Sequence, residues 1–214
     1  MDQKIKFFSY DEGAYELYPP LPANKFIPDW YKNIPNFLNS DGNYITDDDI
    51  PSIKKCIPVR DYMTSGYVIR NCYHVEAKIA KDKLSINTVE HRCKLNDYIA
   101  GHPHPQCPVK MNNEKNHYFK IVQPWRIKTP PGYSCLFYQP YYQLNESFDL
   151  FPAIVDTDKH DDSVNLVGLA KKDFEILPGD PLMVVLPFKR EDWKMEVEFE
   201  DYSEQTAYRY FIKK

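Results

Sequence analysis

The sequence of 214 residues has no apolar run long enough to cross a membrane. A transmembrane helix needs roughly 20 consecutive apolar residues, and no stretch of this chain approaches that length. The first residues, Met1-Asp2-Gln3-Lys4, are charged and do not resemble a secretory signal. We therefore expect no membrane partner and a location in the cytosol or in an assembly built there.

Glycine is scarce in this chain, whereas proline is abundant. There are 7 glycines against 18 prolines and 17 tyrosines. Proline cannot donate a hydrogen bond to a helix or to an inner strand, so this composition favours short strands joined by stiff corners. With 214 residues and no long linker, the chain is predicted to form a single domain of residues 1–214.

A basic surface and paired cysteines are also lacking. The formal charge is −4 and the pI is near 5.9. Non-specific nucleic-acid binding depends on a basic face, so a nucleic-acid partner is not expected. The five cysteines are widely spaced and contain no Cys-x-x-Cys pair. This pattern favours reduced, buried thiols over a disulfide framework or a structural zinc site.

The common catalytic motifs are missing as well. The chain has no Gly-x-Ser-x-Gly elbow and no Gly-rich phosphate loop followed by Lys and Ser or Thr. Cys135 lies in the apolar stretch from Tyr133 to Tyr138, and no base near it in the sequence would activate it. We interpret it as a small buried hydrophobe, and we assign no catalytic residue and no cofactor.

Alternating apolar and polar residues predict a mainly β protein. A hairpin turn is expected at Ala80-Lys81-Asp82-Lys83. One short helix is expected from Pro28 to Lys32, and another is expected before Pro58, which should interrupt it. Strands are predicted at 4–8, 67–70, 73–79, 84–89, 117–122, 125–128, 133–138, 151–156, 163–169, 173–177 and 181–188; residues 193–199 alternate strongly, and residues 208–212 are a candidate final strand.

These predicted elements fall into three stretches. Residues 1–50 are rich in proline and are expected to form an extended arm that lies on a surface. Residues 51–122 are expected to hold an antiparallel sheet with a short helix and an irregular loop, and residues 123–214 the core. Aromatic side chains of the first stretch are predicted to bind a partner, because aromatic residues are enriched at interfaces: Tyr18, Phe26, Trp30 and Tyr31.

The irregular loop carries a candidate metal site. His102 and His104 are separated by one residue and Cys107 follows, which is a combination of side chains that can bind zinc. Two intervening prolines stiffen the loop, and no fourth ligand is evident in the sequence. A solvated loop that lies against a neighbouring subunit is therefore the favoured interpretation.

The segment Asp156-Thr157-Asp158 is the strongest candidate for a catalytic or ligand-binding site. At the end of a strand the two carboxylates share a face, where they can coordinate magnesium, orient a water molecule or accept a sugar hydroxyl. The alternative is a turn in which Asp158 accepts hydrogen bonds from local backbone N–H groups. Gly132 lies at another corner where backbone groups can face a ligand.

Three segments follow one another along the chain. They are the corner from Trp125 to Ser134, the segment Ala153-Ile154-Val155-Asp156-Thr157-Asp158, and the stretch from Phe174 to Phe188. Their order resembles the dUTPase-like β-clip fold of trimeric dUTP pyrophosphatases and dCTP deaminases. The resemblance implies a β-clip or jelly-roll-like barrel in residues 123–214. It also implies that Asp156 would position the hydrolytic water and hold the deoxyribose hydroxyl.

Several groups of that family's nucleotide site are replaced in this chain. Pro131-Gly132 stand at the phosphate-binding Arg-Ser, Lys159 stands at the ribose-stacking Tyr, and Val184 stands at the Gln of the last motif. These replacements disfavour nucleotide hydrolysis. A nucleotide-binding or nucleotide-hydrolysing protein, with Asp156 and Asp158 around magnesium and Lys159 near the ligand, is the main alternative.

Five short segments spread over the whole chain resemble sequences of a tailed-phage (cyanophage-like) protein family that has no assigned catalytic activity. This resemblance implies a viral gene product, located in the virion or in the cytoplasm of the infected host. The segments are Tyr18 to Ala23, Phe26 to Lys32, Met63 to Tyr67, Trp125 to Ser134, and Leu186 to Glu191.

From these observations we expect a non-enzymatic phage structural or accessory protein. It should self-associate, as a trimer, and dock on a larger virion assembly that contains other phage proteins. A further alternative is an inhibitor of a host protein that occupies a groove of its target with residues 15–35.

Overall fold

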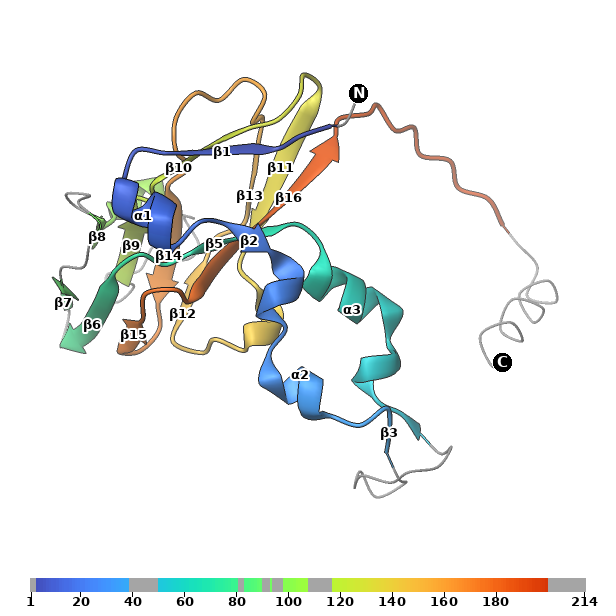
Figure 1. The fold of residues 1–214 in the computed structure, drawn as a ribbon, viewed down its shortest axis with the longest axis horizontal. Helices are drawn as coiled ribbons and strands as arrows, with labels where there is room; N and C mark the ends of the chain where they lie inside the picture. The colour runs from blue at the N-terminus through green and yellow to red at the C-terminus, as the bar shows by residue number, and fades with distance from the viewer. Residues whose placement is uncertain are drawn as a thin grey trace.

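The computed structural model describes residues 3–38, 50–80, 83–89, 93, 98–107 and 117–199. In these ranges the protein is mainly β, as predicted from the sequence (Figure 1). The strands form several open sheets, and no closed barrel occurs within the described ranges. The candidate final strand at 208–212 lies outside the described residues.

A five-stranded antiparallel sheet forms the centre of the molecule, in the order β13-β11-β16-β5-β2. Side chains alternate across it: Cys135 and Phe137 are fully buried on the core side, whereas Leu136 between them is only half-buried on the outer side. The strands are β2 (Leu21–Pro22), β5 (Tyr67–Arg70), β11 (Tyr133–Tyr138), β13 (Ala153–Val155) and β16 (Pro181–Lys189).

Three further groups of strands surround the core side of this sheet. One sheet has the order β12-β14-β9-β8, another has the order β15-β6-β7, and β1 pairs with β10. The predicted hairpin is confirmed, because Ala80 of β6 pairs with Lys83 of β7. The bounds are β1 (Lys6–Ser9), β6 (His74–Ala80), β7 (Lys83–Val89), β8 (Ile99–Gly101), β9 (His117–Ile121), β10 (Trp125–Lys128), β12 (Phe148–Leu150), β14 (Leu166–Ala170) and β15 (Phe174–Ile176).

The hydrophobic core lies between these sheets and is rich in aromatic side chains. Phe119 is fully buried and lies 5.9 Å from the ring of Phe148, which in turn lies 4.9 Å from the ring of Phe174. Trp125 and Phe137 belong to the same buried cluster. Large apolar side chains of this kind contribute about 1.5–3 kcal/mol each when they are fully buried, so this cluster dominates the stability of the fold.

The N-terminal stretch contains more helix than the sequence predicted. Extended geometry was expected around Tyr15, but α1 (Glu12–Leu17) forms there. The helix begins because the carboxylate of Asp11 accepts a hydrogen bond from the backbone N–H of Ala14 at 2.7 Å, and because Ala14 is buried in the core. These tertiary and capping contacts outweigh the local preference for extended chain.

The predicted helix at Pro28 is confirmed as α2 (Asp29–Asn33), with Pro28 as its N-cap residue. The predicted role of Pro58 is wrong, because this residue lies in the first turn of α3 (Ile57–Thr64) and does not interrupt a helix. Proline is tolerated in a first turn because its missing N–H would have no partner within the helix.

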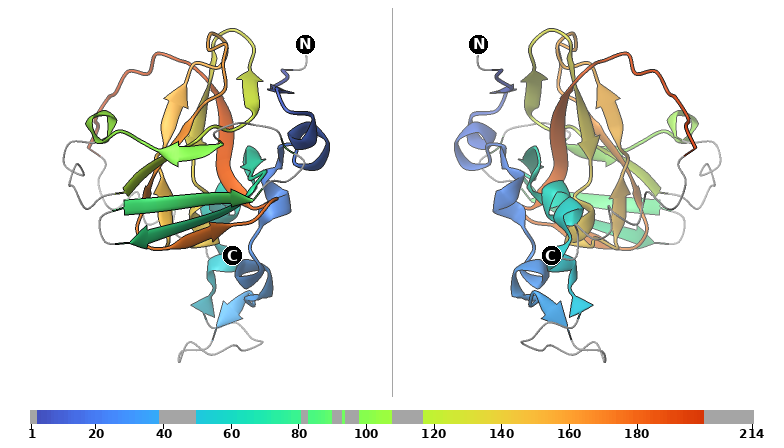
Figure 2. Two further views of the ribbon diagram at one scale, coloured as in Figure 1. Left: turned by 90° about the vertical axis from the view of Figure 1, so that its left-hand side faces the viewer. Right: turned by 90° about the vertical axis from the view of Figure 1, so that its right-hand side faces the viewer.

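The helices α2 and α3 belong to a lobe that projects from one end of the central sheet (Figure 2). The lobe also contains a pair of two-residue strands, β3 (Phe37–Leu38) and β4 (Ile50–Pro51). Two 3-10 turns complete it, Ala23–Phe26 and Ile53–Lys55. No helix in the described part of the chain is long and apolar enough to span a membrane.

Candidate functional site

The segment Asp156-Thr157-Asp158 lies where both sequence interpretations placed it, at a strand end and in a turn. β13 ends at Val155, and Asp156 follows it directly. The backbone oxygen of Asp156 accepts hydrogen bonds from the N–H groups of Lys159 and His160 at 2.9 and 2.8 Å, which closes the turn. The two aspartates are therefore held rigidly beside the end of β11.

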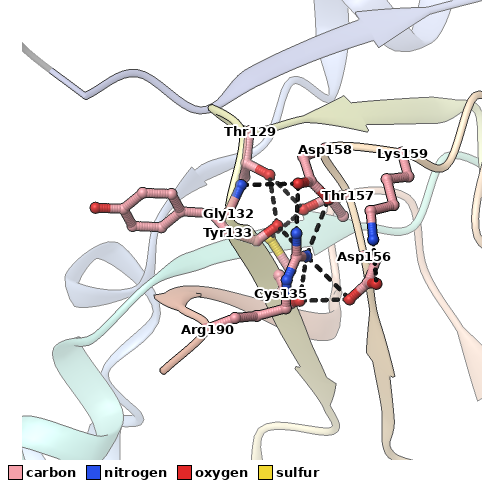
Figure 3. A network of polar contacts seen from close by, with 10 residues as sticks. Thr129, Gly132, Tyr133, Cys135, Asp156, Thr157, Asp158, Lys159 and Arg190 are labelled. Atoms are coloured by element: carbon pink, nitrogen blue, oxygen red, sulfur yellow. Dashed lines mark hydrogen bonds and ion pairs between the residues drawn. The ribbon is translucent and has the colours of Figure 1, made fainter. Parts of the chain in front are cut away.

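Arg190, the first residue after β16, occupies the space between these two aspartates (Figure 3). Its guanidinium donates to both carboxylate oxygens of Asp158, at 2.9 and 2.5 Å. It also lies 3.0 Å from Asp156. A bidentate arginine–carboxylate pair fixes the orientation of both side chains, so Arg190 is held in one position at the end of β16.

Neighbouring groups of β11 complete this arrangement. The backbone N–H of Gly132 donates to Asp158 at 2.8 Å, and the carbonyl of Gly132 accepts from the backbone N–H of Arg190 at 2.8 Å. The hydroxyl of Ser134 donates to Asp156 at 2.6 Å and accepts from Arg190 at 2.9 Å. We call these five residues, Gly132, Ser134, Asp156, Asp158 and Arg190, the arginine clamp.

A smaller set of contacts supports the clamp from beneath. Thr157 is fully buried, and its hydroxyl lies 2.8 Å from the hydroxyl of Thr129 and 3.3 Å from the sulfur of Cys135. Burial raises the pKa of the Cys135 thiol, which disfavours the reactive thiolate. Cys135 is therefore a buried packing residue, as interpreted from the sequence.

The clamp lowers the pKa of both carboxyl groups. Hydrogen bonds from Arg190 hold the pKa of Asp158 well below its usual range. The hydrogen bond from Ser134 and the charge of Arg190 lower the pKa of Asp156. Asp158 is 7 % exposed and Asp156 is 45 % exposed, so only Asp156 presents an oxygen to solvent. Both side chains are carboxylates at neutral pH.

This arrangement does not fit a magnesium ion. Magnesium demands oxygen ligands in near-octahedral geometry, but the oxygens of Asp158 already accept from a guanidinium and a backbone N–H. The nearest positive charge beyond Arg190 is Lys159, whose amine lies 3.7 Å from Asp156. A magnesium ion at Asp156 would therefore lie close to two positively charged side chains, Arg190 and Lys159. The geometry supports an internal ion pair and gives no support to a nucleotide–metal site.

The two other candidates for ligand binding have separate surroundings. Gly132 has a positive φ of +85° at the corner between β10 and β11, and both of its backbone polar groups serve the clamp. The side chain of Lys159 is 71 % exposed at the turn after β13. Lys159 is the candidate that has a charged atom available to another molecule.

The residues of the candidate zinc site do not form a cluster. Cys107 is buried, and its sulfur lies 3.7 Å from the carbonyl of Pro103. His104 packs edge-on against Tyr118 at 5.3 Å, and burial lowers the pKa of His102. In the described part of the chain, His102, His104 and Cys107 do not form a group with metal-binding geometry.

A different group with metal-ligand side chains was missed by the sequence analysis. His74, Glu76 and Glu175 place one ligand atom each within 4.8 Å of one another. Glu175 of β15 pairs directly with Glu76 of β6, and His74 lies 2.6 Å from Glu175. The strand pairing brings the two glutamates together across 99 residues of sequence, so no local pattern reveals the group. Its contacts describe a side-chain hydrogen bond between His74 and Glu175.

The aromatic residues predicted to bind a partner make contacts within the chain. Tyr31 is 5 % exposed, and the indole N–H of Trp30 donates to the carbonyl of Tyr142 at 2.9 Å. Phe26 packs against the small cluster beneath the lobe, and Tyr18 is covered by the guanidinium of Arg70. These side chains attach the N-terminal stretch to the sheet, and their binding to a partner stays a prediction.

Residues 191–199 are exposed throughout, and we call them the C-terminal arm. Its first residue, Glu191, accepts a hydrogen bond from the amine of Lys189 at 2.8 Å. The chain leaves β16 at the arginine clamp and runs away from the sheets (Figures 1 and 2). The sequence predicted the strand-like alternation but not its isolation from every sheet. Four apolar side chains at alternate positions are almost fully exposed: Trp193 at 86 %, Met195 at 88 %, Val197 at 84 % and Phe199 at 95 %.

Comparisons with known proteins give no family for this chain. No protein-family model matches the sequence, and no curated protein is significantly similar to it.

Proposed function

We propose that the protein is a non-enzymatic structural or accessory protein that self-associates and docks on a larger assembly. The observation that carries this proposal is the C-terminal arm, which exposes Trp193, Met195, Val197 and Phe199 along one edge of an extended segment. Soluble monomers rarely leave a continuous apolar surface of this kind uncovered, and such surfaces mark interaction sites.

The energetics favour a docked arm. Each of the four side chains would contribute about 1.5–3 kcal/mol if it moved from water into an apolar environment. Extended segments recognise partners by adding a strand to a sheet edge, where backbone hydrogen bonds provide affinity and alternate side chains provide specificity. The arm has the period of two that this mode of binding requires.

The arginine clamp supports a non-enzymatic function. A nucleotide site built on Asp156 and Asp158 would need both carboxylates to be available to a metal ion or a sugar, but Arg190 pairs with both of them. The clamp instead fixes the point at which the C-terminal arm leaves the sheet. We therefore infer that the clamp residues hold the start of the arm in place, and we expect no nucleotide hydrolysis.

The nature of the larger assembly rests on the sequence. The segments shared with tailed-phage proteins and the order of the corners in residues 125–188 support a β-clip variant in a virion, assembled as a trimer with other phage proteins. The mainly β fold agrees with that proposal at the level of fold class.

Two measurements test the proposal. Light scattering on the purified chain should give a mass above the 25.3 kDa of one copy, and mass spectrometry should find the protein in purified virions. A strictly monomeric protein that is absent from particles would overturn the proposal. A panel of deoxynucleotides with magnesium should leave the melting temperature unchanged; a shift that Asp156→Asn abolishes would support the nucleotide alternative.

A further inference from the structure

The central sheet carries an apolar surface that its own chain does not fully cover. Directly paired residues of an antiparallel sheet lie on the same face, and Leu136 of β11 pairs with both Ile154 of β13 and Leu186 of β16. Phe188 continues this face toward the end of β16. Ile154 is 66 % exposed and Phe188 is 36 % exposed. We call Leu136, Ile154, Leu186 and Phe188 the outer row.

The outer row ends at a strand with a free side. β13 is the last strand of the five-stranded sheet and pairs only with β11 within the described residues. An edge strand presents backbone groups to which another extended segment can pair. On β13 the exposed apolar side chain of Ile154 adjoins that edge, so a strand added there would find backbone partners and an apolar neighbour together.

The arm of the same chain is directed away from this surface. Arg190 is fixed by Asp158, Asp156 and the backbone of Gly132, so the arm begins from a rigid point and leaves the sheet. Folding back onto its own outer row would require the arm to reverse direction, because Leu186 and Phe188 lie on β16, the strand that precedes it. With about 3.3 Å per residue, the nine residues of the arm span about 30 Å, which is long enough to reach a neighbouring molecule.

We propose that the C-terminal arm of one copy adds as a strand to the β13 edge of a second copy and places its apolar side chains next to Ile154, at the end of the outer row. This inference rests on the proposed self-association and names its surface. The contact joins two unlike surfaces, and such contacts close into a ring when the rotation between copies permits. In a trimer, each copy can give one arm and receive one arm, so that every arm is docked and every β13 edge is paired.

Disulfide trapping between two variants that each carry one introduced cysteine tests the contact. In a Cys56→Ser background, which removes the exposed thiol, one variant carries Ile154→Cys and the other carries Val197→Cys. Because a disulfide needs Cα atoms within about 7 Å, oxidation of the mixed variants should give a linked pair of chains only if the arm docks at β13. Leu177→Cys, at a site that is 48 % exposed, replaces Ile154→Cys in the matched control.

The outcomes separate this inference from the proposed function. A linked pair from Ile154→Cys with Val197→Cys, at several-fold the yield of the Leu177→Cys control, supports the inference. Equal yields from a protein that still self-associates overturn the docking site and leave the proposed function standing. A monomeric protein overturns both. A linkage within single chains that carry Ile154→Cys and Val197→Cys together, at high dilution, shows that the arm folds back and also overturns the inference.

A charge substitution gives an independent readout. Ile154→Asp should raise the dissociation constant for self-association by about tenfold or more, because it places a carboxylate in the apolar contact. Leu177→Asp, which lies off the outer row, should leave association unchanged; an equal effect from Leu177→Asp would contradict the assignment.

Discussion

At the scale of single residues, Asp158 and Asn71 show how polar side chains hold the corners of this fold. Asp158 closes the clamp at the start of the C-terminal arm. Asn71 is fully buried, and its amide donates to the carbonyls of Ile176 and Leu177 while its oxygen accepts from Tyr98. The corner Leu177-Pro178-Gly179-Asp180 therefore attaches to Asn71 and serves the fold.

Asp158→Asn is expected to lower the stability of the protein at neutral pH, because it removes the charge that pairs with Arg190. The pKa of Asp158 is lowered in the folded state, so its stabilising contribution is present above the unfolded pKa of about 3.9 and is lost as the pH falls through the folded pKa. Thermal unfolding should therefore separate wild type from the variant at about pH 7, and the gap should shrink as the pH falls toward about pH 3 and below.

Asp29→Asn is the matched control, because Asp29 is 86 % exposed and its pair with Lys32 lies on the surface. It should change the melting temperature little at any pH. A gap between wild type and Asp158→Asn that stays constant with pH would contradict the role given to the Asp158 charge.

Asn71→Ala is expected to destabilise the protein by about 3 kcal/mol, since it leaves buried carbonyls and a tyrosine hydroxyl without partners. Denaturant unfolding measures this free energy. The control is Asn145→Ala, because Asn145 accepts hydrogen bonds only from exposed or half-exposed backbone of its own turn. Similar losses for both variants would argue against the corner contact of Asn71.

At the scale of elements, the bounds of several strands could be predicted from the sequence alone. The predicted bounds of β5, β10 and β11 coincide with the observed ones, because each alternating run ends at a proline, glycine or other corner residue. The helix α1 was missed because it is short and depends on the Asp11 cap and the burial of Ala14. Three-residue strands such as β8 and β12 carry too little pattern to be recognised.

The candidate site could be predicted only in part. The Asp-x-Asp segment and its turn were visible in the sequence, but its partner Arg190 lies 32 residues from Asp158. The two meet because β11 and β16 pair with Tyr133 opposite Lys189, which places Arg190 beside Gly132. That register is a long-range property of the sheet, so local motifs could not distinguish a metal site from an internal ion pair.

Val197→Pro tests the strand character of the C-terminal arm. Proline removes a backbone donor and is excluded from paired inner strands, so this variant should weaken self-association clearly. Its melting temperature as an isolated chain should stay close to that of wild type, because Val197 is 84 % exposed. Glu198→Ala, on the polar edge of the arm, is the control for sedimentation velocity. Unchanged association of Val197→Pro would show that the arm does not bind as a strand.

At the scale of the whole molecule, burial predicts the reactivity of the thiols. Cys56 is exposed, whereas Cys72, Cys93, Cys107 and Cys135 are buried, and all five are free. Burial raises the pKa of Cys93 to about 11 and raises that of Cys72 as well. A colorimetric thiol reagent should therefore modify one cysteine rapidly in the native protein and all five after denaturation without reductant. Fewer than five after denaturation would reveal a disulfide.

The proposed self-association depends on an arm that begins at the arginine clamp and exposes apolar side chains at alternate positions. The most direct test compares the native mass of two variants by sedimentation equilibrium. One variant replaces Trp193, Met195, Val197 and Phe199 with serine, and the other replaces Lys194, Glu196 and Glu198 with serine. The first should be a monomer that unfolds at the wild-type temperature, and the second should assemble like wild type. Full assembly of the first variant would contradict self-association through the C-terminal arm.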